Sequence, residues 1–237
     1  MPLLQRVTAE SGFPPTDCAL DYPNGLLAVG ETLESAQLLQ AYRCGIFPWF
    51  EESQPVLWWT PDPRLILLPD EFHLSRSLRR TLRRDRFRLA VDCCFPEVMQ
   101  ACAAPRDGQA GTWINARMVD AYHRLHRLGH AHSIEVYDDS GELVGGLYGV
   151  NLGAVFYGES MFSRVSDASK VALAGLVRLM RLGGGHLIDC QMETPHLLSL
   201  GARAVPRQAF ERLIAGSVDV KMSVDAWRLP ERCGALL

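Results

Sequence analysis

Three side chains that can direct amine chemistry stand in two short apolar stretches of the chain. Asp189 and Gln191 are two residues apart in one stretch, and Glu159 lies between two small residues in the other. If the first stretch is a strand, Asp189 and Gln191 share one face, because side chains alternate along a strand. A carboxylate in apolar surroundings needs hydrogen-bond donors or a cation. The three residues therefore form either a structural polar network or a site that orients an amine and stabilises its positive charge during attack.

Residues 73–88 concentrate positive charge. Leu74, Leu78 and Leu82 recur every four residues, which is typical of the buried stripe of a helix. The arginines that occupy the remaining positions are Arg76, Arg79, Arg80, Arg83, Arg84, Arg86 and Arg88. Because guanidinium forks match phosphate oxygens, the pattern favours a surface for a phosphate-rich polymer. An exposed, solvated helix is the alternative, and the pattern does not separate RNA from DNA.

Trp49 and Trp113 stand in loop-like surroundings, in IFPWF and GTWI respectively. A tryptophan most often belongs to the core. Beside an arginine-rich helix, a platform on which an unpaired base stacks is the second interpretation.

A run of histidines has spacing that resembles a metal site. His123, His126, His130 and His132 are three, four and two residues apart, but Gly129 interrupts the helix that would align them. No carboxylate or cysteine joins them at ligand spacing. Packing and capping are the favoured roles, and no metal is expected.

The elements that position these residues can be read from periodicity, caps and turns. Helices are expected over 33–44, 96–103, 115–128, 166–181 and 207–215, with a short one from Pro195. Strands are expected over 87–93, 131–137, 143–150, 154–161 and 186–192. The order of these elements from residue 87 onward indicates an α+β domain. It resembles the acyltransferase fold of the N-acetyltransferase superfamily, so we expect an acetyltransferase-like domain.

Coenzyme A-dependent members of that superfamily usually carry a glycine-rich loop between the strand meander and the following helix. Residues 163–168 occupy this place and contain no glycine. The glycines at 183–185 follow a helix, so they read as its C-terminal cap and not as a phosphate loop. Coenzyme A is therefore not expected, and no cofactor is predicted.

Composition sets the outer limits. The chain has 237 residues, 48% hydrophobic and 22% charged, with a net charge of −3. These values exclude wholesale disorder and a globally basic nucleic-acid binder. With no apolar run of membrane-spanning length and no signal-like N-terminus, we expect a cytoplasmic protein, and a monomer by default. Most of the 14 prolines lie in the first seventy residues, which predicts a small N-terminal domain over 1–66 and a larger one over 67–237.

Several motifs in order along the chain resemble those of the bacterial leucyl/phenylalanyl-tRNA–protein transferase family. The matching stretches are GLLAVG (25–30), YRCGIFPWF (42–50), WWTPDPR (58–64), GTWI (111–114), AYHRLHRLGHAHSIEV (121–136), LVGGLYGV (143–150), GESMFSR (158–164), LIDCQ (187–191) and SLGA (199–202). GESMFSR together with LIDCQ is highly specific, and the matches span nearly the whole chain.

The resemblance implies an activity. Enzymes of this family take leucine or phenylalanine, and less readily methionine, from charged tRNA. They attach it to proteins that begin with arginine or lysine, which marks the product for degradation by the N-end rule. The family uses neither a metal nor coenzyme A, and its fold is a small N-terminal domain joined to an acetyltransferase-like domain.

The resemblance also implies roles for individual residues. Asp189 with Gln191 would polarise and position the acceptor amine, and Glu159 would help to hold the reacting groups. Tyr42, Trp49 and Trp113 match positions near the terminal adenosine and the new peptide bond. The residues matching the pocket for the transferred side chain are Leu147, Phe156, Leu173, Leu176 and Ile188. The arginines expected to follow the tRNA acceptor stem are Arg76, Arg79, Arg80, Arg83 and Arg84.

Two other functions stay open at this level. A coenzyme A-dependent N-acetyltransferase would share the fold, but the missing glycine loop speaks against it. A non-catalytic RNA-binding module would share the arginine helix, but the presence of Glu159, Asp189 and Gln191 speaks against that.

Overall fold

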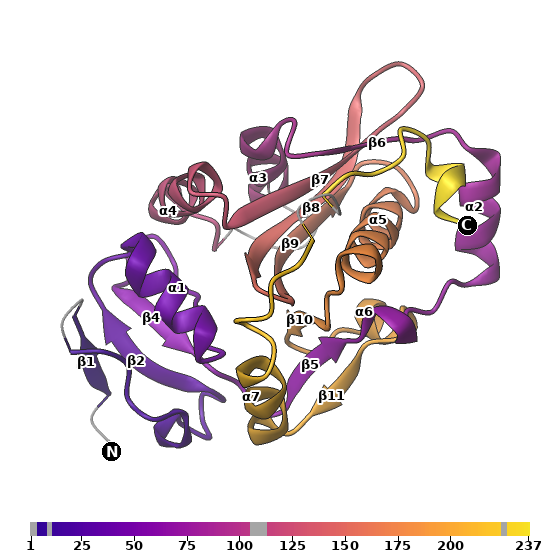
Figure 1. Ribbon diagram of the computed structural model, residues 1–237. Helices are drawn as coiled ribbons and strands as arrows, with labels where there is room; N and C mark the ends of the chain where they lie inside the picture. Colours follow the sequence, from indigo (N-terminus) through magenta and orange to yellow (C-terminus); the bar gives the residue numbers. More distant parts are fainter. Residues whose placement is uncertain (1–3, 9–10, 105–112, 224–226) are drawn as a thin grey trace.

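The computed structural model describes residues 4–8, 11–104, 113–223 and 227–237. It is a mixed structure of helices and strands (Figure 1). Within these residues the strands form two sheets, one of four strands and one of seven. No helix in the described part is long and apolar enough to cross a membrane.

The smaller sheet lies in the N-terminal part. Its strands, in spatial order, are β1 (Gln5–Val7), β2 (Leu26–Gly30), β4 (Val56–Trp59) and β3 (Phe47–Pro48). β1 pairs parallel with β2, and the other neighbours are antiparallel. Helix α1 (Ser35–Arg43) buries Leu38, Ala41 and Tyr42, and its Tyr42 side chain reaches the large sheet.

The larger sheet has the order β11-β5-β10-β9-β8-β7-β6. The bounds of these strands are β5 (Arg64–Leu67), β6 (Arg88–Val91), β7 (Ala131–Tyr137), β8 (Leu143–Leu152), β9 (Val155–Ser163), β10 (Leu187–Gln191) and β11 (Arg203–Val205). β9 and β10 run parallel, and the other neighbours are antiparallel.

Helices cover both faces of this sheet (Figure 1). Their bounds are α2 (Arg76–Arg84), α3 (Phe95–Ala103), α4 (Ala116–Arg127), α5 (Ala168–Gly183), α6 (Pro195–Ser199) and α7 (Arg207–Ala215). Short 3₁₀ turns lie at Thr16–Cys18, Pro69–Glu71 and Cys233–Leu236. α5 packs on one face of strands β7–β9, and α3 and α4 cover the other. The last of the 3₁₀ turns packs against α2.

Alternation along the central strands divides their side chains between two cores. Leu147 of β8 and Phe156 of β9 belong to the core under α5. Their neighbours Tyr148 and Tyr157 belong to the core under α3 and α4. A Cβ on Gly145 would lie 2.5 Å from the Cβ of Ala168, so glycine here lets the start of α5 approach β8 closely.

The strands that carry the three candidate residues diverge. β10 pairs with β9 only through residues 187–189, opposite 155–157. The pairing of β9 with β8 shifts register where Glu159 is inserted, and that of β10 with β5 shifts where Cys190 is inserted. Such bulges re-aim side chains and often lie next to active sites. Here two of them flank the point at which β9 and β10 separate.

Most expected elements form within a few residues of their predicted bounds. The predictions for 131–137 and 207–215 agree with β7 and α7 at both ends. The helix expected over 33–44 is shorter at both ends, as α1. β5 was not predicted as part of the large sheet, and the boundary expected after residue 66 falls inside this strand.

Candidate active site

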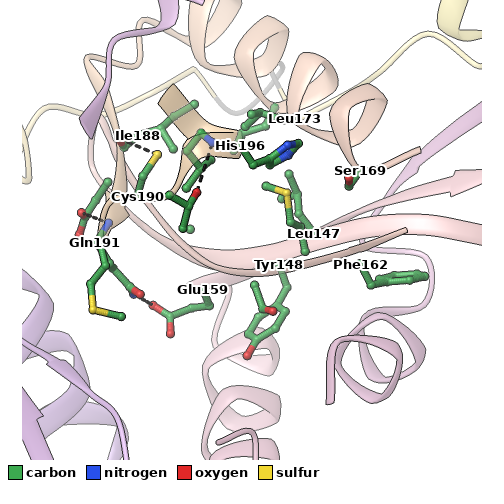
Figure 2. A pocket seen from close by; sticks show the side chains of 18 of the residues that line it. Leu147, Tyr148, Glu159, Phe162, Ser169, Leu173, Ile188, Cys190, Gln191 and His196 are labelled. Carbon is green, nitrogen blue, oxygen red and sulfur yellow. Dashed lines mark hydrogen bonds between the residues drawn. The ribbon is translucent and has the colours of Figure 1, made fainter. Parts of the chain in front are cut away.

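A cavity of about 970 Å³ opens where β9 and β10 separate. Its walls come from β8, β9, β10, α5 and α6, and from the Phe47–Trp49 segment of the N-terminal part. Figure 2 shows Leu147, Glu159, Leu173, Ile188 and Gln191 among the lining side chains. The predicted site residues that line it are Trp49, Trp113, Leu147, Phe156, Glu159, Leu173, Leu176, Ile188, Asp189 and Gln191. The structure therefore brings these residues to one place, while the arginine helix lies elsewhere.

Glu159 is the acceptor at the centre of a hydrogen-bond cluster. Its Oε1 accepts from the Tyr42 hydroxyl at 2.8 Å and from Gln191 Nε2 at 2.9 Å. Its Oε2 accepts from the Tyr122 hydroxyl at 2.9 Å. The hydroxyl oxygens of Tyr42 and Tyr122 also contact each other. Tyr42 thus supports the site from behind Glu159, together with Tyr122, which the sequence did not single out.

Burial changes the proton affinity of this cluster. Desolvation raises the pKa of Glu159 to about 7, although the hydrogen bonds from Tyr42 and Tyr122 act in the opposite direction. Desolvation and the nearby Glu159 carboxylate hold the pKa of both tyrosines well above the usual value. Both hydroxyls therefore stay protonated, and Glu159 is the group of the cluster that changes charge near neutral pH.

Asp189 differs from the expectation that its side chain faces an amine beside Gln191. Its side chain has no exposed surface, and both of its oxygens are bound by Arg64. The distances are 2.8 Å from Nε to Oδ1 and 2.6 Å from Nη2 to Oδ2. Asp189 lies within the cavity wall, but its charge is paired inside the protein.

Gln191 connects Asp189 with Glu159. Its backbone N–H donates to Asp189 Oδ1 at 2.9 Å, and its side chain donates to Glu159 (Figure 2). Its φ of 60° lies in the left-handed region that non-glycine residues rarely adopt. Because of the bulge and this backbone conformation, the two side chains do not share one face of the strand as simple alternation predicts. The Gln191 side chain reaches the cavity, while the Asp189 side chain points to Arg64.

An apolar hollow adjoins this polar cluster. Leu147, Phe156 and Ile188 project from three neighbouring strands toward Leu173 and Leu176 of α5. All five are at most 3% exposed. An aliphatic or aromatic side chain that entered here would be transferred from water to hydrocarbon contacts, which favours binding.

The two tryptophans line the cavity and are half-buried. Trp49 packs on Trp59 with ring centroids 5.5 Å apart, and the Trp59 indole N–H donates to the Trp49 carbonyl at 2.7 Å. The Trp49 backbone is therefore fixed, while part of the ring stays accessible. This geometry fits a stacking surface.

The arginine helix forms as α2. Leu78 and Leu82 are buried, and the Ser75 hydroxyl caps the first turn by accepting from the Leu78 N–H at 3.2 Å. The five arginines expected to bind tRNA are all exposed, namely Arg76, Arg79, Arg80, Arg83 and Arg84. None of them forms an ion pair with another described residue. Their charge is therefore available to an anionic partner.

The histidines have structural contacts. His132 bonds Asp92 through Nδ1 at 2.7 Å and stacks on Trp227, and His126 bonds the Ala131 carbonyl and stacks on Phe95. Over the described part of the chain, no group of three or more His, Cys, Asp or Glu side chains could hold a metal ion.

Arg64 is a second site residue, after Tyr122, that the sequence reasoning missed. It precedes the apolar run Leu65–Leu68, just as Asp189 stands in the apolar stretch of β10. Two opposite charges, each in an apolar strand, can both be buried only if they pair. The presence of an arginine and an aspartate, each beside or within an apolar strand, was therefore the signal in the sequence that could have identified Arg64 as the partner of Asp189.

Comparison with solved structures gives weak likenesses. "The structure of L-PGS from Bacillus licheniformis" has a TM-score of 0.41 and 12% identity, and the match covers 71% of this chain and 54% of that one. The C-terminal domain of a putative lysylphosphatidylglycerol synthetase from Agrobacterium fabrum has a TM-score of 0.40, also at 12% identity, over 79% and 64% of the two chains. Likeness at this level does not identify the fold.

Comparison of sequences is decisive. The family model for leucyl/phenylalanyl-tRNA protein transferase matches residues 66–215, and the model for the N-terminal domain of the same enzymes matches residues 31–62. A leucyl/phenylalanyl-tRNA–protein transferase of Pseudomonas fluorescens is 56% identical over 207 residues, which are 87% of this chain and 91% of that one. Another from Thiobacillus denitrificans is 56% identical over 93% of this chain and 96% of that one. The chain therefore belongs to the leucyl/phenylalanyl-tRNA–protein transferase family.

Proposed function

We propose that this enzyme moves leucine or phenylalanine, and less readily methionine, from charged tRNA to the N-terminal arginine or lysine of acceptor proteins. The product would be marked for degradation by the N-end rule in the cytoplasm. The observation that carries the proposal is the cavity itself, where an apolar hollow directly adjoins the Glu159–Gln191 hydrogen bond. Membership of the family supports an aminoacyl-tRNA as donor and a protein as acceptor.

The chemistry requires alignment more than activation. An aminoacyl ester is already reactive, so no covalent enzyme intermediate is needed. The nucleophile is an α-amine with a pKa of about 7.7–8.0, which leaves a usable neutral fraction. Attack forms the new C–N bond and breaks the ester C–O bond, and the proton that the amine loses balances the one that the leaving oxygen of the terminal adenosine takes up to become a hydroxyl. Holding the amine and the carbonyl in contact supplies the main acceleration.

Gln191 is the group that meets the amine. A carboxylate only accepts hydrogen bonds, so ionised Glu159 holds the Nε2 end of Gln191. The amide oxygen is then directed away from Glu159 and can accept an N–H of the acceptor, which orients the nitrogen lone pair. The carboxylate of Glu159 also stabilises the positive charge that develops on nitrogen during attack.

The remaining contacts position the donor. The transferred side chain fills the hollow formed by Leu147, Phe156 and Ile188 on the sheet and by Leu173 and Leu176 on α5. The terminal adenosine stacks against Trp49 and Trp113, with Tyr42 holding Glu159 behind them. The exposed arginines of α2 follow the acceptor stem, whose backbone is read with little regard to sequence.

The architecture is proposed to be acetyltransferase-like in the C-terminal part, on the order of its elements and the parting of β9 from β10. We place the division from the small N-terminal domain between the two sheets, just before Arg64, because β5 pairs with β10 and β11. Residues from both parts line the cavity.

The test is transfer from ¹⁴C-leucyl-tRNA to peptides that differ only in their first residue, arginine, lysine or alanine. We expect label in the arginine and lysine peptides and none in the alanine peptide. A parallel reaction supplies ¹⁴C-acetyl-coenzyme A in place of tRNA. Acetylation of the peptide would support an N-acetyltransferase, and tRNA binding without any transfer would support an RNA-binding module; either result would contradict the proposal.

A further inference from the structure

Arg64 lies between the two parts of the molecule with its side chain fully buried. The guanidinium is enclosed by two aromatic rings, its carbon 4.8 Å from the centroid of Phe47 and 4.6 Å from that of Phe210. Such enclosure removes water from a permanently charged group, so every donor must find a partner in the protein.

The partners of Arg64 come from both parts of the molecule. Nε and Nη2 form a two-pronged contact with the two oxygens of Asp189, and Nη1 donates to the Gly45 carbonyl at 3.0 Å. Gly45 lies just before β3, whose Phe47 and Pro48 line the cavity. Asp189 lies on β10, which also lines the cavity. A single planar group thus joins these two segments.

The contact extends to the residue that meets the amine. Asp189 Oδ1 is shared by Arg64 Nε and by the backbone N–H of Gln191. That N–H belongs to the residue with φ of 60°, directly after the bulge at Cys190. An unfavourable backbone conformation persists only when its surroundings hold it. The Asp189 oxygen does so here, and Arg64 in turn fixes the orientation of that oxygen.

We infer that Arg64 is a positioning residue of the transfer reaction, which acts through Asp189 to hold Gln191 in the left-handed conformation that aims its amide at Glu159 and at the acceptor amine. The inference rests on the proposed function, because Gln191 must be the group that receives the amine. Lysine cannot replace arginine here, since an ammonium is a point charge that cannot reach both carboxylate oxygens and the Gly45 carbonyl in one plane.

The test is a double-mutant cycle between Arg64→Lys and Gln191→Ala, measured as single-turnover transfer of leucine to the arginine peptide with enzyme in excess. Arg207→Lys is the matched control. Arg207 also joins the two parts, with Nη1 donating to the Thr60 carbonyl at 3.0 Å, but Asp189 is not among its contacts. Thermal melting and tRNA affinity are measured for every variant.

If Arg64 acts through Gln191, Arg64→Lys slows transfer by at least about tenfold at saturating enzyme and peptide. tRNA affinity stays unchanged, and Arg207→Lys transfers at the wild-type rate. The Arg64→Lys/Gln191→Ala double variant is then no slower than Gln191→Ala alone, because residues that act as a unit give non-additive losses.

Other results would overturn the inference. It fails if the losses in the double variant are additive, or if Arg64→Lys transfers leucine at the wild-type rate. In either case, transfer by the wild-type enzyme still supports the proposed function. Absence of wild-type transfer overturns both. If Arg64→Lys does not fold, the same cycle with Asp189→Asn decides, since asparagine keeps the volume and an oxygen for the Gln191 N–H; additivity there again overturns the inference.

Discussion

Nε2 of Gln191 lies 2.9 Å from Oε1 of Glu159, so a buried carboxylate determines which end of the Gln191 amide turns to the cavity. The carboxylate itself is held by two tyrosine hydroxyls, one from α1 and one from α4. The orientation of one amide is thereby fixed by three elements that are far apart in the sequence.

Glu159→Gln tests that orientation. A glutamine can present either end of its own amide, so the Gln191 amide is no longer held one way. We expect kcat for transfer to fall by about 10²-fold, as a small misplacement of reacting groups can cost, while the KM for aminoacyl-tRNA stays the same. Glu193→Gln, at an exposed site beyond β10, is the control and keeps the wild-type kcat. An unaltered kcat in Glu159→Gln would contradict the assignment.

The raised pKa of Glu159 also makes stability depend on pH. The folded protein binds a proton with a pKa of about 7, compared with 4.5 for a free glutamate side chain. Between these values the folded state holds more protons than the unfolded state, so stability falls as pH rises from 4.5 to 7 and levels off above. The contribution of Glu159 over this interval is about 3 kcal/mol.

Urea unfolding of wild type and Glu159→Gln across that interval measures this contribution. The difference in unfolding free energy between the two proteins should shift steadily in favour of the glutamine variant with rising pH. Other titrating groups, such as Glu135, are common to both proteins and cancel in the difference. A difference that does not depend on pH would mean that Glu159 is not buried as an acid of raised pKa.

The apolar hollow should determine which amino acid is transferred. Leu173→Phe narrows the space between α5 and the sheet, so the bulkier phenylalanine side chain fits less well than that of leucine. One methylene in such a pocket changes selectivity by about tenfold. We therefore expect the preference for leucine over phenylalanine to be at least about tenfold higher in the variant than in the wild type. The measurement is kcat/KM with leucyl- and phenylalanyl-tRNA. Leu182→Phe changes an exposed position of the same helix and should leave the ratio as it is; an equal shift in both variants would count against the pocket.

The exposed arginines of α2 should carry tRNA affinity. Arg80→Glu should weaken tRNA binding and reduce the slope of log affinity against log salt by about 1 for each phosphate that the arginine neutralises. Arg127→Glu makes the same charge change at the exposed end of α4, away from α2 (Figure 1), and should affect binding little. Titration of labelled tRNA by fluorescence anisotropy at several salt concentrations measures both. Equal weakening in the two variants would show that net charge, and not α2, determines affinity.

Local patterns sufficed for the elements after residue 87. Alternation in residues 131–137 and the Asn115 cap before α4 act within a few residues, and both are present in the structure. β5 was not predicted as a strand of the large sheet, because its pairing with β10 and β11 joins residues more than a hundred positions apart in the sequence. The concentration of prolines in the first seventy residues suggested a boundary inside it.

The site was only partly predictable for the same reason. Glu159, Asp189 and Gln191 were selected as polar residues in apolar strands, which is a local property. The two bulges and the left-handed Gln191 send the Asp189 and Gln191 side chains in different directions. Strict alternation would have placed them together. The partner of Asp189 comes from β5, which no pattern around Asp189 reveals.

The most direct measurement of the central claim is the single-turnover rate of Gln191→Ala, with the enzyme in saturating excess over leucyl-tRNA and with saturating arginine peptide. Because Gln191 is proposed to orient the amine and not to bind the donor, the rate should fall by at least about 10²-fold while tRNA affinity is unchanged. A variant that transfers leucine at the wild-type rate would contradict the claim.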